Sequence, residues 1–228
     1  MTRLNLGAGR VILPVTPETQ YPHLAPMPDG CFEKGWLNVD KYHNPGIQEV
    51  IDLFVFPWIR SSNGSPFNDN SVDEIYCSHI VEHIPHQVRQ HPMIPVNWMR
   101  KYESLINDYD GWFVFFTECW RILKPSGLIH IVTPYGASYA GMGDPTHTRY
   151  ILPASFSYFT PNPNAPFDYH LPCEFKAVSD PLLIFTEYGV EYSKLNDDIA
   201  LRRAMSTQYN IIDEIRLTME AVKDADSG

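Results

Sequence analysis

The sequence predicts an α/β fold, namely one Rossmann-like, doubly wound sheet of seven strands with helices on both faces. Two patterns support this fold. Short apolar runs alternate with stretches whose apolar residues recur at helical spacing, and the run at 128–133 is almost continuously apolar, as in a strand buried on both faces. The last two runs are expected to pair with each other. The sheet should therefore be mostly parallel, with a C-terminal antiparallel hairpin.

Seven apolar runs are expected to form the strands. The first leads directly into Gly7, and the second ends on Asp40, so both finish at residues that turn the chain or contact a ligand. The last run alternates apolar and polar residues, which is typical of a strand with one buried face. The expected strands are residues 4–6, 36–39, 49–53, 72–78, 128–133, 173–178 and 209–222.

Three helices are expected between these strands. Trp98 and Leu105 fall on one face of the first. The second is followed by Lys124-Pro125-Ser126-Gly127, where proline and glycine stop a helix and turn the chain. The expected helices are residues 98–108, 113–123 and 197–205.

The chain is expected to form a single domain, 1–228, because 228 residues of which 44% are apolar can bury one full core. Residues 85–111 exceed what a simple connection needs and are expected to form a lid insertion. Residues 136–171 are rich in Pro, Tyr, Phe and Asn and are expected to form loops on the acceptor side of a site. Residues 223–228 are expected to be a flexible tail.

Composition and charge exclude several classes of protein. A net charge of −10 disfavours nucleic acid as a partner. No apolar run is long enough to span a membrane, and the chain enters a strand at once, which leaves no room for a signal peptide. The four cysteines, scattered without a C-x-x-C pair, suit reduced thiols, so we expect a cytoplasmic protein.

The first two strands carry the features of a nucleoside site. Gly7-Ala8-Gly9 follows the first strand, and glycines allow a ligand to lie against bare backbone. Asp40 ends the second strand, where a carboxylate can accept hydrogen bonds from both hydroxyls of a ribose. In an open α/β sheet these two strand ends lie at the same edge. A G-x-G sequence alone is weak evidence, so the remaining chain must support it.

An ordered set of motifs supports it. Together they resemble the class I S-adenosylmethionine-dependent methyltransferases, in particular the type 11 group. The pieces cover residues 3–135 and come in the order typical of that family. They are Leu4-Asn5-Leu6-Gly7-Ala8-Gly9, Gly35-Trp36-Leu37-Asn38-Val39-Asp40, Asp52-Leu53, Pro66-Phe67-Asn68-Asp69-Asn70-Ser71-Val72-Asp73-Glu74-Ile75, Ser78-His79-Ile80-Val81-Glu82-His83 and Phe116-Thr117-Glu118-Cys119-Trp120-Arg121-Ile122-Leu123-Lys124-Pro125-Ser126-Gly127-Leu128.

The resemblance implies an enzyme of the EC 2.1.1 class that uses S-adenosyl-L-methionine as cofactor. It implies that the glycine turn lies under the methionine part, that Asp40 holds the ribose hydroxyls and that Asp52 and Leu53 meet the adenine. Ser78 and His79 would lie beside the sulfonium. The cofactor-binding residues implied in this way are Asn5, Gly7, Ala8, Gly9, Asp40, Asp52, Leu53, Ser78 and His79. Taken singly, Asp40 and Asp52 could equally be turn or cap residues.

One departure from the family pattern bears on the choice of cofactor. Residues 10–35 carry five prolines, so a long helix directly after the glycine turn is not expected. A pyrophosphate needs the positive end of a helix, whereas S-adenosylmethionine has no phosphate. The third glycine of the dinucleotide fingerprint is also missing after Gly9. Both facts favour S-adenosylmethionine over NAD.

The acceptor side is expected at residues 144–150, which follow the fifth strand. Asp144, His147 and Arg149 place an acid, an imidazole and a guanidinium close together, suitable for binding a small-molecule or saccharide-type acceptor. His147 or His79 is the candidate base that takes the acceptor's proton during in-line methyl transfer to oxygen or nitrogen. The alternative is a loop held by its own salt bridge.

Two other functions stay open. His79-Ile80-Val81-Glu82-His83 matches H-x-x-E-H, a zinc peptidase signature, which would make the chain a zinc hydrolase through His79 and His83. That motif needs a long helix, and here it follows a buried strand, so we expect no metal. The second alternative is a cofactor-binding or interaction protein with a vestigial methyltransferase fold, favoured by the proline-rich first loop.

Overall fold

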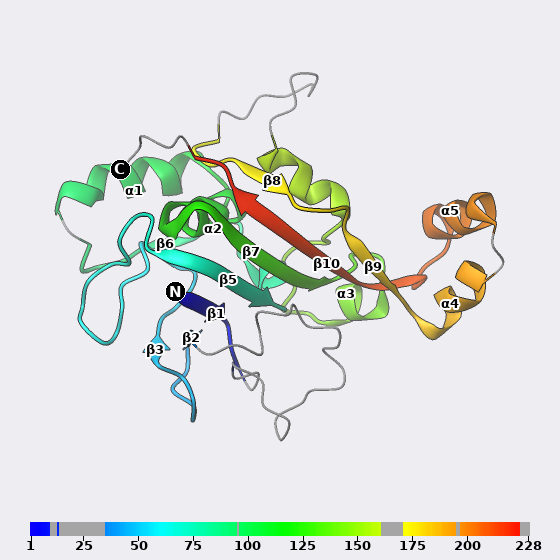
Figure 1. The fold of residues 1–228 in the computed structure, drawn as a ribbon, viewed down its shortest axis with the longest axis horizontal. Coiled ribbons are helices and arrows are strands. Elements are labelled where there is room, and N and C mark those ends of the chain that lie inside the picture. Colours follow the sequence, from blue (N-terminus) through cyan, green and yellow to red (C-terminus); the bar gives the residue numbers. More distant parts are fainter. Residues whose placement is uncertain (10–12, 14–34, 95, 161–170, 195–196, 224–228) are drawn as a thin grey trace.

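The computed structural model describes residues 1–9, 13, 35–94, 96–160, 171–194 and 197–223. The chain forms a mixed sheet with helices packed against it (Figure 1). Its strands and helices are β1 (Arg3–Leu6), β2 (Trp36–Asp40), β3 (Glu49–Val50), β4 (Val55–Phe56), β5 (Val72–Ser78), 3-10 helix η4 (Val81–His83), β6 (Arg89–Gln90), α1 (Val96–Asp108), α2 (Gly111–Ile122), β7 (Leu123–Pro134), α3 (Tyr139–Gly143), 3-10 helix η5 (Pro153–Phe159), β8 (Phe175–Ala177), β9 (Leu182–Phe185), α4 (Glu187–Lys194), α5 (Asp198–Thr207) and β10 (Ile212–Ala221).

The main sheet confirms the expected fold class. Its strand order is β3-β2-β1-β5-β7-β10-β8, with β9 also paired to β10. Strands β3, β2, β1, β5 and β7 are mutually parallel, whereas β10 runs antiparallel to β7, β8 and β9. The expected C-terminal antiparallel hairpin is therefore present, and its long strand β10 lies inside the sheet beside β7 (Figure 1). None of the described helices is long and apolar enough to cross a membrane.

The register of the parallel strands brings three strand ends to one edge. Leu6 lies opposite Val39 of β2 and Cys77 of β5, so Gly7, Asp40 and Ser78 follow at the same level. The antiparallel β10 contributes its beginning to this edge, because Glu214 lies opposite Pro134 at the end of β7. We call this the carboxyl edge of the sheet.

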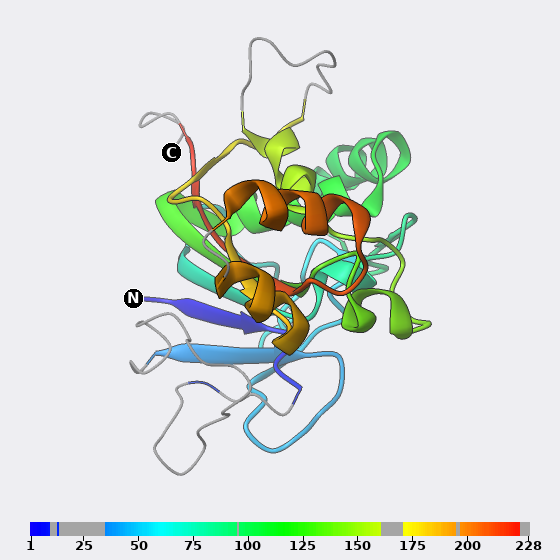
Figure 2. The same ribbon diagram turned by 90° about the vertical axis from the view of Figure 1, so that its right-hand side faces the viewer.

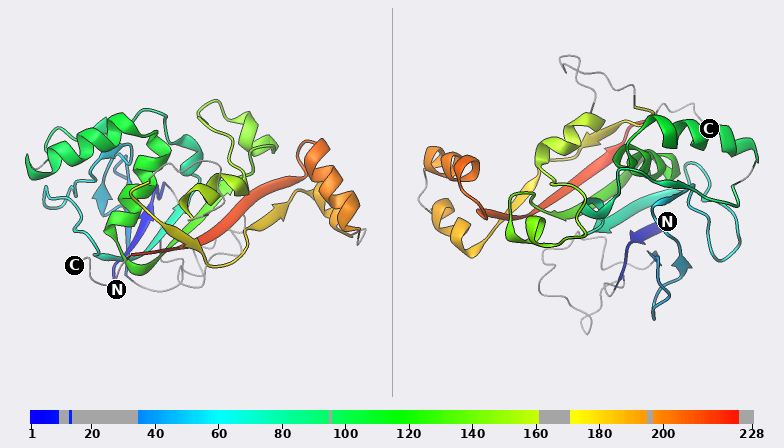
Figure 3. Two further views of the ribbon diagram at one scale, coloured as in Figure 1. Left: turned by 90° about the horizontal axis from the view of Figure 1, so that it is seen from above. Right: turned by 180° about the vertical axis from the view of Figure 1, so that it is seen from behind.

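One face of the sheet carries the main core. Leu4, Ile75 and Ile129 lie on that face at 0% exposure and pack with aromatic residues of α1 and α2. Apolar residues at 114–116 of α2 are fully buried there. Seen from above, these two helices lie together on one side of the sheet (Figure 3, left). Because every second strand residue points to this face, the helices cover a continuous apolar surface.

The other face carries a smaller cluster of Leu13, Trp36, Tyr76 and Val132. Beside it, Asn5 Nδ2 donates to Asn38 Oδ1 at 2.8 Å. Asn38 also accepts from Leu13 N and donates to Leu13 O, at 2.8 and 2.9 Å. The amide of Asn38 thereby fixes the backbone at residue 13. Residues 10–12 and 14–34, on which most of the expectation about a helix after the glycine turn falls, lie outside the described residues.

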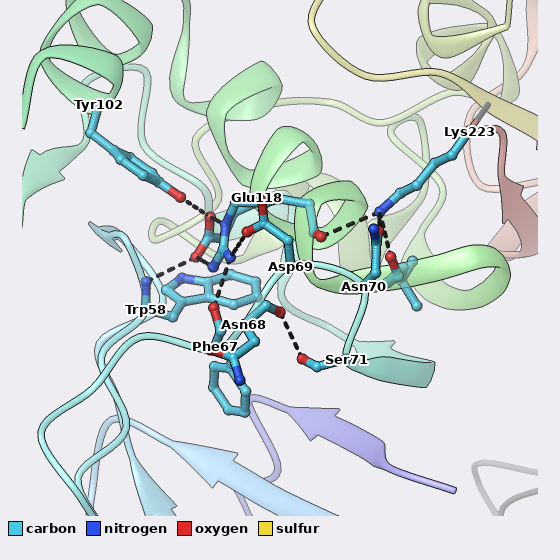
Figure 4. Close-up of polar contacts among 11 residues, drawn as sticks. Trp58, Phe67, Asn68, Asp69, Asn70, Ser71, Tyr102, Glu118 and Lys223 are labelled. Carbon is cyan, nitrogen blue, oxygen red and sulfur yellow. Dashed lines mark hydrogen bonds and ion pairs between the residues drawn. The ribbon is translucent and has the colours of Figure 1, made fainter. Parts of the chain in front are cut away.

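A buried ion pair joins α2 to the loops beneath it. Glu118 is fully buried and accepts from Arg121 Nη2 at 2.8 Å, from Trp58 N at 3.0 Å and from the Tyr102 hydroxyl of α1. Burial alone would raise the pKa of Glu118, but the charge and hydrogen bonds of Arg121 hold it below its usual value. Arg121 Nη1 also pairs with Asp69 at 2.6 Å. Figure 4 shows Tyr102 and Trp58 reaching Glu118 from different elements.

The C-terminal region differs from the expectation in one respect. Between the two hairpin strands the structure contains β9, α4 and α5, and only the last helix was expected. These elements form an arm that projects beyond the carboxyl edge (Figures 1 and 2). Gly189 of α4 allows this packing, because a Cβ there would lie 1.9 Å from the carbonyl oxygen of Ile211. The segment lacks a long apolar repeat and is therefore hard to detect from sequence.

Residues 85–111, expected as a lid insertion, contain β6 and α1. Tyr102 and Leu105 of α1 are buried in the main core, and β6 pairs with β4 in a second, two-stranded sheet. Much of this segment is thus part of the packed fold, and a lid role for the rest stays a prediction. Of the expected acceptor-side loops, residues 161–170 lie outside the described residues, as do residues 224–228 of the expected tail.

The buried pair generates a prediction about stability. Arg121→Met should lower the free energy of unfolding by about 3–5 kcal/mol, because Glu118 would keep its charge in the core without its cation. Lys124→Met is the matched control: the Lys124 side chain is 45% exposed in its ion pair with Asp73, so its loss should cost at most about 1 kcal/mol. Urea unfolding followed by circular dichroism measures both. Equal effects of the two variants would contradict this account of α2.

Candidate functional site

The glycine turn after β1 adopts the left-handed backbone conformation that glycine favours. Gly7 has φ +62° and Gly9 has φ +53°. The two glycines differ in their surroundings. A Cβ on Gly7 would lie 1.9 Å from Ile80 Cδ1, so Gly7 makes room for Ile80. A Cβ on Gly9 would meet nothing nearer than 3.8 Å among the described residues, so the open backbone surface lies at Gly9.

Asp40 is held beside this open surface. Its Oδ2 accepts from Gly9 N at 2.8 Å and its Oδ1 accepts from Tyr42 N at 2.9 Å. Ala8 N donates to Val39 O at 3.0 Å, which fixes the turn against β2. Each carboxylate oxygen can accept more than one hydrogen bond, so Asp40 keeps acceptor capacity for a ligand. The glycine turn and Asp40, the two features predicted to form a nucleoside site, thus lie together at the carboxyl edge.

The other predicted cofactor residues lie in different settings. Asp52 Oδ2 pairs with Arg89 Nη2 at 2.9 Å, and its Oδ1 accepts from Phe54 N at 3.1 Å. Leu53 packs in the main core and its carbonyl oxygen accepts from Trp58 Nε1. The Asn5 side chain points to the second face of the sheet. Ser78 ends β5 at the carboxyl edge. Their contact with a cofactor stays a prediction.

His79 has a strained backbone, and its ring lies between two carboxylates. It has φ +55°, which is unusual for a residue with a Cβ. Its Nδ1 lies 3.4 Å from Glu82 Oε1 and its Nε2 lies 3.4 Å from Glu214 Oε2. Burial lowers the pKa of this ring, but the nearby carboxylates of Glu214 and Glu82 outweigh burial and raise the pKa to about 9. At neutral pH His79 is therefore a cation, which argues against a role as base.

The sequence did not indicate Glu214 as part of this edge. It sits near the start of β10, and only the antiparallel pairing with β7 brings it to the carboxyl ends of the parallel strands. Burial raises its pKa, but the hydrogen bonds of His79 and Arg216 hold the pKa below its usual value. The sequence predicted only the pairing of the last two strands with each other, so it held no signal that places Glu214 beside β7.

Residues 144–149 form a loop that is held by hydrogen bonds within it and by contacts with neighbouring segments. Arg149 Nη2 donates to Ile84 O at 2.7 Å, and Arg149 Nη1 pairs with Asp110 Oδ1 at 3.0 Å. Asp144 Oδ1 accepts from the backbone and the hydroxyl of Thr146, and these hydrogen bonds lower the pKa of Asp144. The Asp144 contacts lie within the loop, whereas Arg149 pairs with Asp110 of another segment and not with an acid of the loop. The contacts of Arg149 tie the loop to η4, Val81–His83, and to the beginning of α2.

Of the two predicted bases, His79 and His147, His147 has the ring that is better placed to accept a proton. Its side chain is 7% exposed, and its Nδ1 lies 2.9 Å from the carbonyl oxygen of Gly141, which accepts a hydrogen bond from it. The Nδ1 proton is thereby fixed, and Nε2 carries the free lone pair. Asp144 Oδ2 lies 3.9 Å from Nε2, beyond hydrogen-bond distance. His147 lies at the expected acceptor side, and its role there stays a prediction.

The H-x-x-E-H motif does not form the zinc peptidase arrangement. That arrangement needs both histidines on one long helix, whereas η4 has three residues. His79 faces Glu82 and Glu214, and His83 faces residue 146 of the 144–149 loop. His79 and His83 are thus directed to different partners. The sequence hypothesis of a zinc hydrolase through this pair gains no support from the geometry.

A cavity of about 320 Å³ opens beside the same loop. Arg149 and Asp110 form its polar part, and Trp112, Tyr150 and Tyr158 are among its aromatic lining residues. Arg149 also lies over the Trp112 ring, 5.4 Å from its centroid. Aromatic walls with a few fixed polar groups are typical of sites for ring-shaped ligands.

Comparison with known proteins finds similarity in structure only. No family model and no curated protein matches the chain. A S-adenosylmethionine-dependent methyltransferase from Archaeoglobus fulgidus is 14% identical, with 96% of this chain and 85% of that one covered and a TM-score of 0.45. A 1,6-didemethyltoxoflavin-N1-methyltransferase from Burkholderia thailandensis, solved with its substrate and S-adenosylhomocysteine, is 11% identical over 97% and 71%, with a TM-score of 0.41.

The similar structures also include the cyclase SpnF, 10% identical over 98% of this chain and 75% of that one, with a TM-score of 0.47. A fold does not by itself imply a function, so function must be argued from the site. The sheet order and the carboxyl edge described above define the class of this protein: a Rossmann-like α/β protein with a glycine turn and an acidic strand end at one edge.

His79 generates a prediction about pH. Because its pKa is raised above the usual 6.5 to about 9 in the folded chain, its contribution to stability is complete below pH 6.5 and is lost as pH rises through 9. The difference in unfolding free energy between the native chain and His79→Gln should shrink over that interval. Urea unfolding from pH 6 to 9.5 measures it. A constant difference would show that His79 is not held as a cation.

Proposed function

We propose that the chain is a S-adenosylmethionine-dependent methyltransferase, EC 2.1.1, that moves a methyl group to an oxygen or nitrogen of a small-molecule or saccharide-type acceptor. The observation that carries the proposal is the pairing of Asp40 with Gly9. An acidic strand end fixed by backbone N–H groups next to an open glycine suits the ribose and the amino acid part of an adenosyl sulfonium. Nucleic acid is not proposed as a partner, given the net charge of −10.

The proposed reaction is an in-line displacement at the methyl carbon. The sulfonium is already an activated leaving group, so holding the reacting atoms about 3–3.5 Å apart supplies much of the acceleration. His79 lies between the carboxylates of Glu82 and Glu214 at the end of β5. Because its raised pKa leaves His79 protonated at neutral pH, we do not propose His79 as the base.

The acceptor is proposed to enter from the side of the 144–149 loop. His147 has the free Nε2 that a base requires, and the aromatic cavity beside Arg149 suits a ring-shaped acceptor. Three cysteines, Cys77, Cys119 and Cys173, are buried free thiols, which supports the proposal of a cytoplasmic location.

Binding of S-adenosylhomocysteine tests the cofactor site. Asp40→Asn should weaken binding by about 10- to 100-fold, because hydrogen bonds to a charged group contribute ~1.5–3 kcal/mol. Asp73→Asn is a matched control. Asp73 also accepts from a backbone N–H, that of Thr2, but at the opposite edge of the sheet. Titration calorimetry should give native affinity for Asp73→Asn. No measurable binding by the native chain would reject the proposed function and favour the vestigial fold.

Turnover tests the acceptor side. With methyl-labelled S-adenosylmethionine and a panel of sugars, phenols and amines, the native chain should release S-adenosylhomocysteine with at least one acceptor. His147→Asn should lower kcat by about 100-fold or more, the usual size of a general base effect. His91→Asn, which replaces a histidine whose Nδ1 accepts from Met93 N, should keep native turnover. Unchanged kcat in His147→Asn would remove His147 from the mechanism.

A further inference from the structure

We propose that Glu82, His83 and His147 bind a divalent transition-metal ion, with Zn²⁺ as the ion their chemistry fits best. One donor atom of each side chain lies within 4.8 Å of the other two. The rings of His83 and His147 are 4.7 Å apart between centroids and stand at 72° to each other. Two donors from η4 and one from the 144–149 loop thus lie close together. This inference does not depend on the proposed methyl transfer.

In both imidazoles a hydrogen bond occupies Nδ1 and leaves Nε2 free to bind a metal ion. His147 Nδ1 donates to the carbonyl oxygen of Gly141 at 2.9 Å. His83 Nδ1 lies 3.3 Å from the carbonyl oxygen of Thr146, and the Thr146 hydroxyl donates its own proton to Asp144. His83 Nδ1 is therefore the donor to Thr146, and Nε2 of each ring keeps its lone pair. A metal-binding histidine usually donates its other N–H to a backbone carbonyl in this way.

The buried carboxylate of Glu82 is a second observation that supports a metal site here. Its side chain is 2% exposed, and its Oε2 accepts from Thr133 Oγ1 at 3.1 Å. Its Oε1 is buried and has no hydrogen-bond partner among the described residues. His79 Nδ1 lies 3.4 Å away and forms an ion pair with Oε1, so the charge of Glu82 is partly compensated while the hydrogen-bonding capacity of Oε1 stays unfilled. A buried carboxylate oxygen without a hydrogen bond is costly, and a bound cation would satisfy it.

Hydrogen bonds hold the three donor side chains near one another in the absence of the ion. Thr148 N donates to Glu82 O at 2.9 Å, and Thr148 Oγ1 donates to Ile84 O at 2.6 Å. These bonds hold the loop that carries His147 against η4, which carries the other two donors. In a tetrahedral zinc site with bonds of about 2.0–2.2 Å, ligand atoms are roughly 3.3 Å apart. The donor atoms, which lie within 4.8 Å of one another, therefore need to approach by up to about 1.5 Å on binding.

The donor set selects the class of ion. Two imidazole nitrogens favour Zn²⁺ and its neighbours in the transition series over Mg²⁺ and Ca²⁺, which prefer oxygen ligands. Three protein ligands leave a coordination position open, as in catalytic rather than structural zinc sites. An ion there would lower the pKa of a hydroxyl bound at the open position. Because His147 Nε2 cannot both bind a metal and accept a proton, metal binding would replace its role as a base.

Metal binding is measured on the full chain after treatment with a chelator. Zn²⁺ should bind at one equivalent in calorimetry against a competing chelator, and Co²⁺ should produce the visible absorption of a nitrogen- and oxygen-bound ion. His147→Asn and His83→Asn should each weaken Zn²⁺ binding by at least about 100-fold, the upper range for loss of a partner group at a metal site. His91→Asn is the control and should bind as the native chain does.

Two outcomes would overturn the proposal. One is absence of stoichiometric Zn²⁺ or Co²⁺ binding by the native chain. The other is native affinity in both His83→Asn and His147→Asn, with circular dichroism showing that the variants are folded. Should a variant unfold, X-ray absorption of the zinc-loaded native chain decides: sulfur or fewer than two imidazoles around the ion contradicts the site. S-adenosylhomocysteine binding is measured separately, so failure of the metal site and failure of the proposed function are distinguishable.

Discussion

The site depends on one constraint, the position of β1 between β2 and β5 in a parallel sheet. This pairing puts Gly9 and Asp40 side by side, and their hydrogen bond makes the glycine turn and the acidic strand end one rigid unit. The next strands extend the same edge: β5 ends before His79, and β10, running the other way, brings Glu214 to it.

Two buried glutamates in this chain show how structural and functional acids differ. Glu118 is completely paired, by Arg121, by Tyr102 and by the backbone of Trp58, so its charge is matched within the core. Glu82 is equally buried, but one of its oxygens lacks a hydrogen bond among the described residues. Both oxygens of Glu118 accept hydrogen bonds, whereas the Glu82 oxygen without one lies near the imidazoles of His83 and His147, and this difference supports the ligand site proposed at Glu82.

The sequence predicted the strands that carry the site because their signals are local. Val72–Ser78 was predicted with its exact bounds, and Asp40 was recognised because a carboxylate at a strand end is visible in a short stretch. The turn expected at 124–127 proved to be an irregular part of β7, since strand pairing with β5 prevailed over local breaking residues. Arg149, His147 and Glu82 were not assigned to their partners, because those contacts join segments far apart in the chain.

The most direct test of the central claim is a crystal structure of the chain with S-adenosylhomocysteine. The account predicts that the ribose hydroxyls donate to the Asp40 carboxylate and that the amino acid part lies against the backbone of Gly9, at the ends of β1 and β2. A ligand bound elsewhere, or Asp40 still held by Gly9 and Tyr42 with no ligand contact in a fully occupied complex, would contradict it.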